Sequence, residues 1–256
     1  YRPFIQVMME KQVYPRIKHY HRGPIMEPYD SSGWTMPLLM GVKSSPVNHP
    51  LDAFPMSRIK DISYQKEEIS GDGDYYAIPA RYNRSVIAVN RLHKSKHMVY
   101  RYTGTETGDL VKGDFLVKAS EVNPAKMASV LEETGISVNR VTPADGKAIK
   151  SLTASRIAVF QPYSPSMDEG WTRWVLDNFG FPFTIIHKKD FHWNKFKNID
   201  VVIFADMGRE TIIDGFPRRY RRYYNPEGSP PEYRGGIGKK GVDVLKAFVK
   251  KGGTVI

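Results

Sequence analysis

Residues 155–183 constrain the fold of this chain most strongly, because strand, loop and helix signals follow one another there without interruption. Residues 156–161 form a short apolar run that ends at a proline, as a buried strand does. Ser166 stands three residues before Glu169, which is the capping-box pattern of a helix start, and Gly180 occupies the position of a helix-ending glycine. The segment therefore predicts the first half of a β-α-β unit, and ligands of open α/β sheets bind where such strands end.

The helix predicted in this segment has apolar residues at helical spacing. Trp171, Trp174, Val175 and Phe179 recur at intervals that bring them toward one face. The two tryptophans could stack on a sugar or a peptide, but packing in the core is the more common role of such a face. We therefore expect Trp171 and Trp174 to be buried.

Strand and helix signals alternate along the rest of the chain. We expect helices that start near Ser85, after Asn123 and at Val242. Repeated units of this type predict an α/β protein with a mostly parallel sheet and helices on both faces. The expected strands are residues 75–79, 98–102, 115–118, 136–141, 183–186 and 199–205.

Prolines interrupt the first part of the chain repeatedly, so residues 1–68 are expected to form an irregular, Pro-rich connector. Residues 69–256 are expected to form one α/β region, and a division of that region near residue 150 stays open. The chain starts with Tyr1 rather than Met, and residues 253–256 have the character of a strand start. We therefore expect the sequence to be part of a longer polypeptide.

Three stretches resemble the region downstream of the catalytic domain in bacterial zinc carboxypeptidase-like proteins of peptidase family M14. The stretches are YDSSGWTMPLLMGV at 29–42, MDEGWTRWVLDNFGFPF at 167–183 and PPEYRGGIGKKGVDVLKAFVKKGGTVI at 230–256. The later part also resembles class I glutamine amidotransferase folds. This resemblance implies a flavodoxin-like sheet, and it implies that the peptidase domain of the same polypeptide is the partner of this region.

The resemblance also implies the activity of the parent protein, which would be a zinc-dependent hydrolase that removes C-terminal residues from peptides. Such a parent would be secreted, periplasmic or attached to the cell envelope. The zinc would lie in the separate catalytic domain, because the zinc ligands of the family belong to that domain.

The catalytic residues of these families are missing from this sequence. None of the seven histidines has a glutamate three residues later, the spacing of a family M14 zinc site. His93 and His97 stand four residues apart on a predicted helix, but the residues between them lack the glutamate of an HExxH site. The chain has no cysteine, so the nucleophile of a glutamine amidotransferase is also missing. We expect an accessory segment with no catalytic residues, no metal site and no cofactor of its own.

Two groups of residues form a candidate site for an anionic glycan or peptide, the ligand of an alternative function as a stand-alone binding module. Glycines allow backbone N–H groups to approach an anion, and the start of a helix adds partial positive charge. Structural explanations stay open for both groups: acids are favourable in a first helical turn, and glycines form tight turns. The candidate residues are Asp168, Glu169, Arg173, Glu232, Tyr233, Arg234, Gly235, Gly236 and Gly238.

The chain is basic, with 38 Lys and Arg against 27 Asp and Glu and a net charge of +11. This charge favours an anionic partner or surface. Residues 218–224, RRYRRYY, interleave arginine and tyrosine as single-strand nucleic-acid binders do. A solvated or partner-contacting loop is the more common role of such a segment, so we do not expect nucleic-acid binding. No apolar run reaches the ~18 residues of a membrane-spanning helix.

Overall fold

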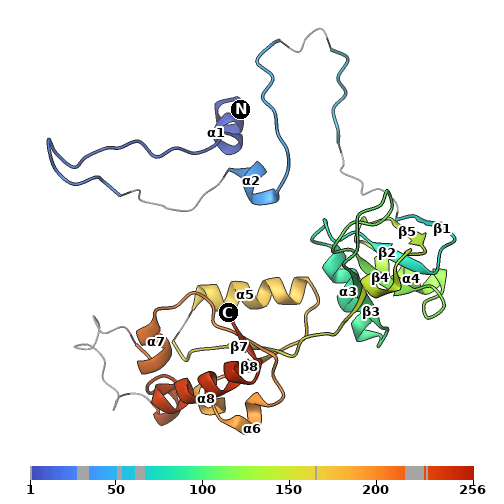
Figure 1. Cartoon of the computed structure of the whole chain (residues 1–256). Helices are drawn as coiled ribbons and strands as arrows, with labels where there is room; N and C mark the ends of the chain where they lie inside the picture. The colour runs from blue at the N-terminus through green and yellow to red at the C-terminus, as the bar shows by residue number, and fades with distance from the viewer. Residues whose placement is uncertain are drawn as a thin grey trace. The chain divides into compact units, whose positions relative to one another are not determined.

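The computed structural model describes residues 2–27, 35–50, 54–60, 67–164, 166–216, 228 and 230–256. The chain divides into two compact units, Tyr1–Asp61 and Ile62–Ile256. The first unit contains helices α1 (Arg2–Met9) and α2 (Met36–Met40), and its described residues 10–27, 41–50 and 54–60 form no further helix or sheet (Figure 1). Within the described ranges, no helix combines the length and the apolar character that spanning a bilayer requires.

The second unit begins with a six-stranded sheet of mixed direction. Its strand order is β1-β5-β2-β4-β3-β6, and only β1 and β5 are parallel neighbours. The pairs β2–β4, β2–β5, β3–β4 and β3–β6 are all antiparallel. The strands are β1 (Ile69–Gly71), β2 (Tyr75–Ile78), β3 (Val99–Tyr102), β4 (Phe115–Lys118), β5 (Val138–Val141) and β6 (Ile149–Leu152).

Two β-α-β units interleave in this mixed sheet. Strands β2 and β3 both run antiparallel to β4, so they are parallel to each other although β4 lies between them. The same holds for β4 and β5, which are separated by β2. This is the split β-α-β arrangement of ferredoxin-like folds. The predicted strands and helices of this part are present, but the expected mostly parallel pairing is wrong here, because a strand of the other unit lies between the two strands of each unit.

Helices α3 (Ser85–Lys94) and α4 (Pro124–Leu131) cover one face of the mixed sheet. Asn123 caps α4, since its side-chain oxygen accepts a hydrogen bond from the backbone N–H of Lys126 at 2.8 Å. The helices and strands bury one continuous apolar core between them. Its most deeply buried members are Tyr76, Ile78, Ala88, Leu92, Val99, Val117, Val122, Met127, Leu131 and Val138.

A four-stranded, fully parallel sheet follows, in the order β10-β9-β7-β8. Helix α5 lies on one face of this sheet, and α6 and α8 lie on the other (Figure 1). The predicted α/β class is therefore confirmed, and the expectation of a parallel sheet holds for this part of the chain. The elements are β7 (Ile157–Phe160), α5 (Met167–Asn178), β8 (Phe183–Ile186), α6 (Trp193–Phe196), β9 (Val201–Ile203), α7 (Arg209–Asp214), α8 (Gly238–Lys250) and β10 (Thr254–Val255).

Helix α5 begins as predicted but faces the sheet differently. The Ser166 hydroxyl accepts a hydrogen bond from the backbone N–H of Glu169 at 3.2 Å, which confirms the N-cap. Glu169 and Leu176, seven residues apart on the same side, are the buried residues of the helix. Trp171 and Trp174 are on the opposite side and are 62% and 56% exposed. The prediction that both tryptophans are buried is wrong, because Glu169 faces inward in their place.

Strands β7 and β9 are joined at their amino ends by an ion pair. The Asp200 carboxylate accepts hydrogen bonds from Arg156 Nη2 at 2.6 Å, from Arg156 Nε at 2.9 Å and from the Arg156 backbone N–H at 2.8 Å. These donors lower the pKa of Asp200 to about 2. The ion pair therefore links the starts of the two central strands of the parallel sheet, which also pair through their backbones.

Candidate functional site

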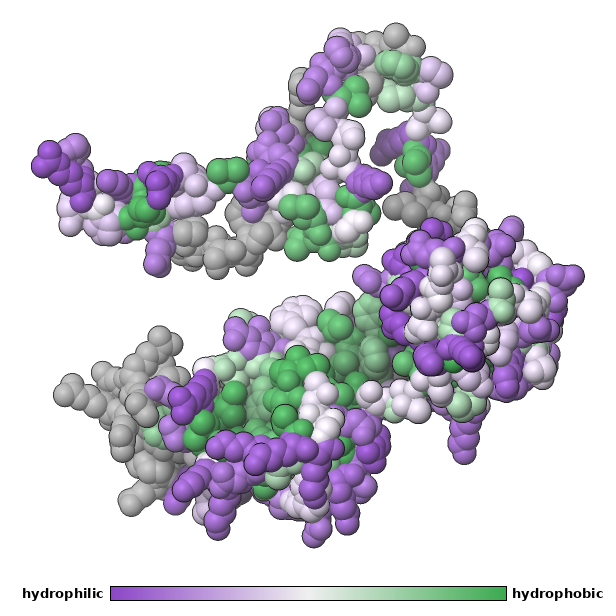
Figure 2. Space-filling view, viewed as in Figure 1, coloured by the Kyte–Doolittle hydropathy of each residue, from purple (hydrophilic) through white to green (hydrophobic). Residues whose placement is uncertain are grey.

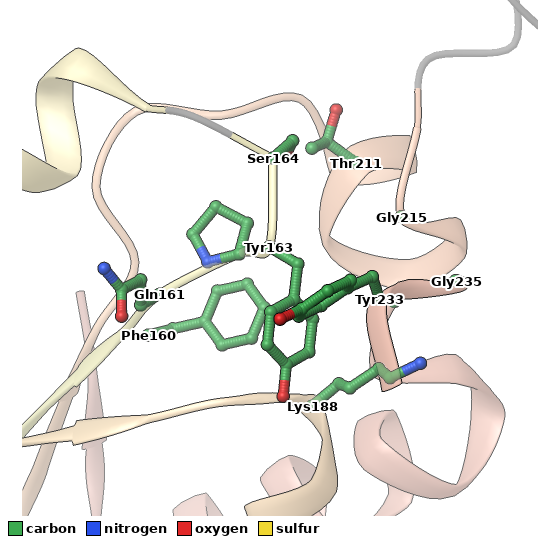
Figure 3. A pocket seen from close by; sticks show the side chains of 11 residues that line it. Phe160, Gln161, Tyr163, Ser164, Lys188, Thr211, Gly215, Tyr233 and Gly235 are labelled. Atoms are coloured by element: carbon green, nitrogen blue, oxygen red, sulfur yellow. The ribbon is translucent and has the colours of Figure 1, made fainter. Parts of the chain in front are cut away.

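The carboxyl end of β7 borders a small cavity of about 20 Å³ (Figure 3). A space of this size holds about one water molecule. Strand β7 has β8 on one side and β9 on the other, so the order of the sheet reverses at β7. Open α/β sheets bind ligands at such a reversal. The lining residues are Phe160, Gln161, Pro162, Tyr163, Ser164, Lys188, Thr211, Gly215, Tyr233, Gly235 and Gly236.

Three aromatic rings lie together at this edge of the sheet. Tyr163 stacks on His187 with ring centroids 4.9 Å apart and planes 5° from parallel. Tyr233 packs edge-on against Tyr163, with ring centroids 4.8 Å apart. Figure 3 shows these two side chains beside each other. His187 Nδ1 lies 3.0 Å from the carbonyl oxygen of Gln161, which orients the imidazole ring. Tyr163 and His187 thus form a stacked pair, and Tyr233 covers part of the Tyr163 ring in this conformation.

Lys188 connects the end of β8 to the segment that carries Tyr233. Its ammonium group donates to the carbonyl oxygen of Pro231 at 3.2 Å and also to that of Arg234. Since these carbonyls lie on both sides of Tyr233, Lys188 holds this segment over the cavity. A ligand anion that reached Lys188 would compete with the two backbone carbonyls.

The glycines of the predicted ligand segment allow a close approach of two backbones. A Cβ atom at Gly236 would lie 2.2 Å from the carbonyl oxygen of Ile212, and one at Gly215 would lie 2.3 Å from the carbonyl carbon of Gly235. The N–H of Ile237 donates to the Ile212 carbonyl at 2.9 Å. This packing accounts for the glycines structurally, and an anion site at them stays a prediction.

The structure separates the two predicted groups of ligand residues. Tyr233, Gly235 and Gly236 line the cavity, and Glu232 and Arg234 flank Tyr233 in the same segment. Gly238 is the first residue of α8 and has φ +61°. The other group, Asp168, Glu169 and Arg173, belongs to α5 and is not part of the cavity lining.

Within α5, the buried Glu169 carboxylate pairs with the guanidinium group of Arg173 one turn later. The Nε–Oε1 distance is 2.7 Å and the Nη2–Oε2 distance is 3.1 Å. Asp168 is exposed. Because Arg173 neutralises Glu169 within the helix, the ion pair explains how a carboxylate is tolerated on the inward side of α5.

The histidine pair considered as a metal site does not share a helix face. His93 lies in the last turn of α3, whereas His97 follows the end of that helix. Partial burial lowers the pKa of His93. Among the residues that the structure describes, no group of three or more His, Asp or Glu side chains is arranged to hold a metal ion. The basic segment 218–224 lies outside the described residues.

Larger surface hollows also occur among the described residues. One of about 430 Å³ lies between residues of α3 and residues in and after α4. Two others differ in character. One of about 410 Å³ belongs to the mixed sheet, and its buried acid, Asp114, accepts hydrogen bonds from the N–H groups of Ala80 and Val111. The other, of about 370 Å³, lies beside the edge strand β10 and has a mostly apolar lining. Val255 of β10 and Ile256, which follows it, are both exposed. Figure 2 shows apolar side chains at the surface of the part of the chain that contains the parallel sheet.

Sequence reasoning missed several residues of the cavity, namely Tyr163, Lys188, Thr211 and Gly215, together with the neighbouring His187. Tyr163, His187 and Lys188 come within two residues of the ends of the predicted strands 156–161 and 183–186. Their position after two strands of a parallel sheet was the available signal. Thr211 and Gly215 belong to α7 and its end, in a stretch where no helix was predicted.

Comparison of the chain with models of protein families, with curated proteins and with solved structures found no match. The second unit is an α/β structure in which a parallel sheet brings aromatic, basic and glycine residues together at the carboxyl ends of β7 and β8.

Proposed function

We propose that this chain is the accessory region of a zinc carboxypeptidase-like protein and that its parallel sheet serves there as a ligand-binding module. The observation that carries the binding role is the cluster of Tyr163, His187 and Tyr233 beside the cavity at the reversal point of the sheet, and we call this cluster and cavity the aromatic crevice. Two of the stretches that resemble the family form α5 and the segment from Pro230 to β10, which border the same sheet. A flavodoxin-like or amidotransferase-like relationship of this sheet is part of the proposal.

The ligand of this proposal is an extended molecule with an anionic group, such as an acidic glycan or a peptide, and the cavity of about 20 Å³ must open to admit it. Tyr233 packs against the Tyr163 ring, so a ligand must displace the Tyr233 side chain before it can contact Tyr163. The anionic group would then replace the backbone carbonyls that Lys188 now contacts. In the parent protein, zinc in the separate catalytic domain would supply an activated water for peptide hydrolysis, and this chain would contribute binding.

A stand-alone module that binds an anionic glycan or peptide is the second candidate, and the same crevice favours it. The two candidates differ in what else the natural polypeptide contains. Mass spectrometry of the natural polypeptide separates them: the accessory role requires a mass well above the 29.2 kDa of this sequence and zinc-dependent release of C-terminal residues. A natural polypeptide of 29.2 kDa would contradict the accessory role.

The binding site itself is tested by titration calorimetry with an acidic oligosaccharide and with a peptide that has a free carboxylate. Lys188→Met should weaken binding by about tenfold, because the anion loses its charged donor. Tyr82→Ala is a matched control, since this exposed tyrosine lies in the mixed-sheet part. Unchanged affinity of the Lys188 variant for both ligands would exclude this crevice as the site.

A further inference from the structure

Helix α5 carries an exposed apolar strip that the crevice does not use. We define the α5 strip as Met167, Trp171, Trp174 and Val175, which follow one another at spacings of four, three and one residues. Met167 is 81% exposed and Val175 is 45% exposed, in addition to the two exposed tryptophans. Soluble proteins seldom expose such large side chains together unless they form an interaction surface.

The charged residues beside the α5 strip are acidic. Asp168 and Asp177 are both exposed on the same helix, one near each end of the strip. Arg173 is engaged by Glu169, so its charge is neutralised within the helix. The surface of α5 thus differs in sign from the chain as a whole, which has a net charge of +11. Charge complementarity favours a basic partner at this position.

The geometry of the two indole rings favours a basic side chain over a sugar ring as the bound group. Trp171 and Trp174 meet edge to face, with centroids 5.7 Å apart and planes at 84°. Rings at this angle do not form a flat platform for a sugar ring, whereas a Lys or Arg side chain can bind over an indole face. A membrane surface fits less well, because helices that lie on anionic lipid carry basic residues on their polar face.

We propose that the α5 strip docks a basic, amphipathic peptide segment of a partner protein. The apolar side chains of the segment would pack on Met167 and Val175, and its Lys or Arg side chains would lie over the indole rings. Asp168 and Asp177 would pair with further basic residues at the two ends of the strip. Tryptophan side chains supply much of the binding energy at protein interfaces, so Trp171 and Trp174 are the expected anchors.

Fluorescence anisotropy with the full chain and a labelled amphipathic peptide of Leu and Lys residues tests this proposal. A matched peptide with Glu in place of Lys should bind at least ~10-fold more weakly. The double variant W171A/W174A should weaken binding of the Lys peptide by ~30-fold or more. The double variant D168N/D177N should weaken it by ~3- to 10-fold at low salt, and this difference should shrink at high salt.

Val249→Ala is the matched control, because Val249 is an exposed apolar residue on α8, away from the strip. It should bind the Lys peptide like the unmodified chain. The proposal is overturned if the Lys peptide shows no saturable binding, if the Glu peptide binds equally well, or if W171A/W174A binds normally. Burial of the strip in a dimer of this chain, seen by analytical ultracentrifugation and lost in W171A/W174A, would also overturn it. Preferential binding to anionic phospholipid vesicles would do the same.

Discussion

The two sheets of the second unit use the same sequence pattern and pair their strands in different ways. In the parallel sheet, β7 and β8 are joined through α5 and become direct neighbours. In the mixed sheet, β2 and β3 are joined through α3, yet β4 lies between them. The comparison teaches that a β-α-β signal predicts the relative direction of two strands but does not predict whether they are neighbours.

The difference in pairing also determines where a site can form. All four strands of the parallel sheet have their carboxyl ends at one edge, so the loops that follow β7 and β8 lie together there. In the mixed sheet, neighbouring strands mostly run in opposite directions, so the loops that follow neighbouring strands mostly leave from opposite edges. The aromatic crevice therefore belongs to the parallel sheet.

The largest effects are expected from glycines at which two backbones touch, one in each sheet region. A Cβ atom at Gly73 or at Gly236 would lie 2.2 Å from the backbone of Val141 or of Ile212, respectively. Gly73→Val and Gly236→Val should each reduce the free energy of unfolding by about 2–4 kcal/mol, measured by urea denaturation. Hydrogen exchange should show lost protection in β2 and β5 for the first variant and in α7 and α8 for the second.

Gly170 in α5 provides the control for this pair, because a Cβ atom there would meet nothing within 4 Å. Gly170→Ala should raise the free energy of unfolding by about 0.5–1 kcal/mol, since glycine is unfavourable inside a helix. If a single glycine variant lost hydrogen-exchange protection in both sheets, the two sheets would unfold together. The distinction drawn between the two sheets would then be weaker.

Removal of either of two helix caps should lower the free energy of unfolding by less than the glycine variants do, and by the same amount at both caps. Asn123 caps α4 beside the mixed sheet, and Ser166 caps α5 beside the parallel sheet. Asn123→Ala and Ser166→Ala should each lower the free energy of unfolding by about 1 kcal/mol, because each leaves a helical N–H without its acceptor. Thermal denaturation measures both, and Asn123→Asp and Ser166→Asp should retain most of the stability. A strongly unequal loss would mean that one helix depends mainly on tertiary packing.

The smallest effect is expected from the Arg156–Asp200 ion pair, and this effect depends on pH. The folded pKa of Asp200, about 2, is below its ordinary value of 3.8. The stabilisation by the carboxylate is therefore complete above the ordinary pKa and disappears as the pH falls from about 4 to 2. The Asp200 side chain is 42% exposed, so solvent screening limits the stabilisation to about 0.5–1 kcal/mol.

The measurement compares the free energy of unfolding of the unmodified chain and of Asp200→Asn across this pH range. The two should differ at neutral pH and converge near pH 2, and a difference that persists there would exclude the ion pair as its cause. The mixed sheet has a weaker ion pair for comparison, between Lys118 and Glu121, with a single Nζ–Oε1 contact of 3.5 Å. Glu121→Gln should therefore change stability less than Asp200→Asn does.

The local elements were predictable because short-range signals determine them. The apolar run 156–161 contains β7, and the Ser166 and Asn123 caps mark the starts of α5 and α4 as expected. Short elements with weak patterns, such as α7 and β6, were not predicted. The orientation of α5 was predicted incorrectly, because a sequence pattern does not show that Arg173 neutralises Glu169 and lets it face inward.

The sequence by itself determined where most strands and helices begin and end, the α/β class and the basic charge of the chain. Only the tertiary structure decided which strands are neighbours, which side of α5 is exposed and which residues surround the crevice. The physical reason is the range of the interactions. Caps and periodicity act over a few residues, whereas the contacts among Tyr163, His187 and Tyr233 join segments far apart in the chain.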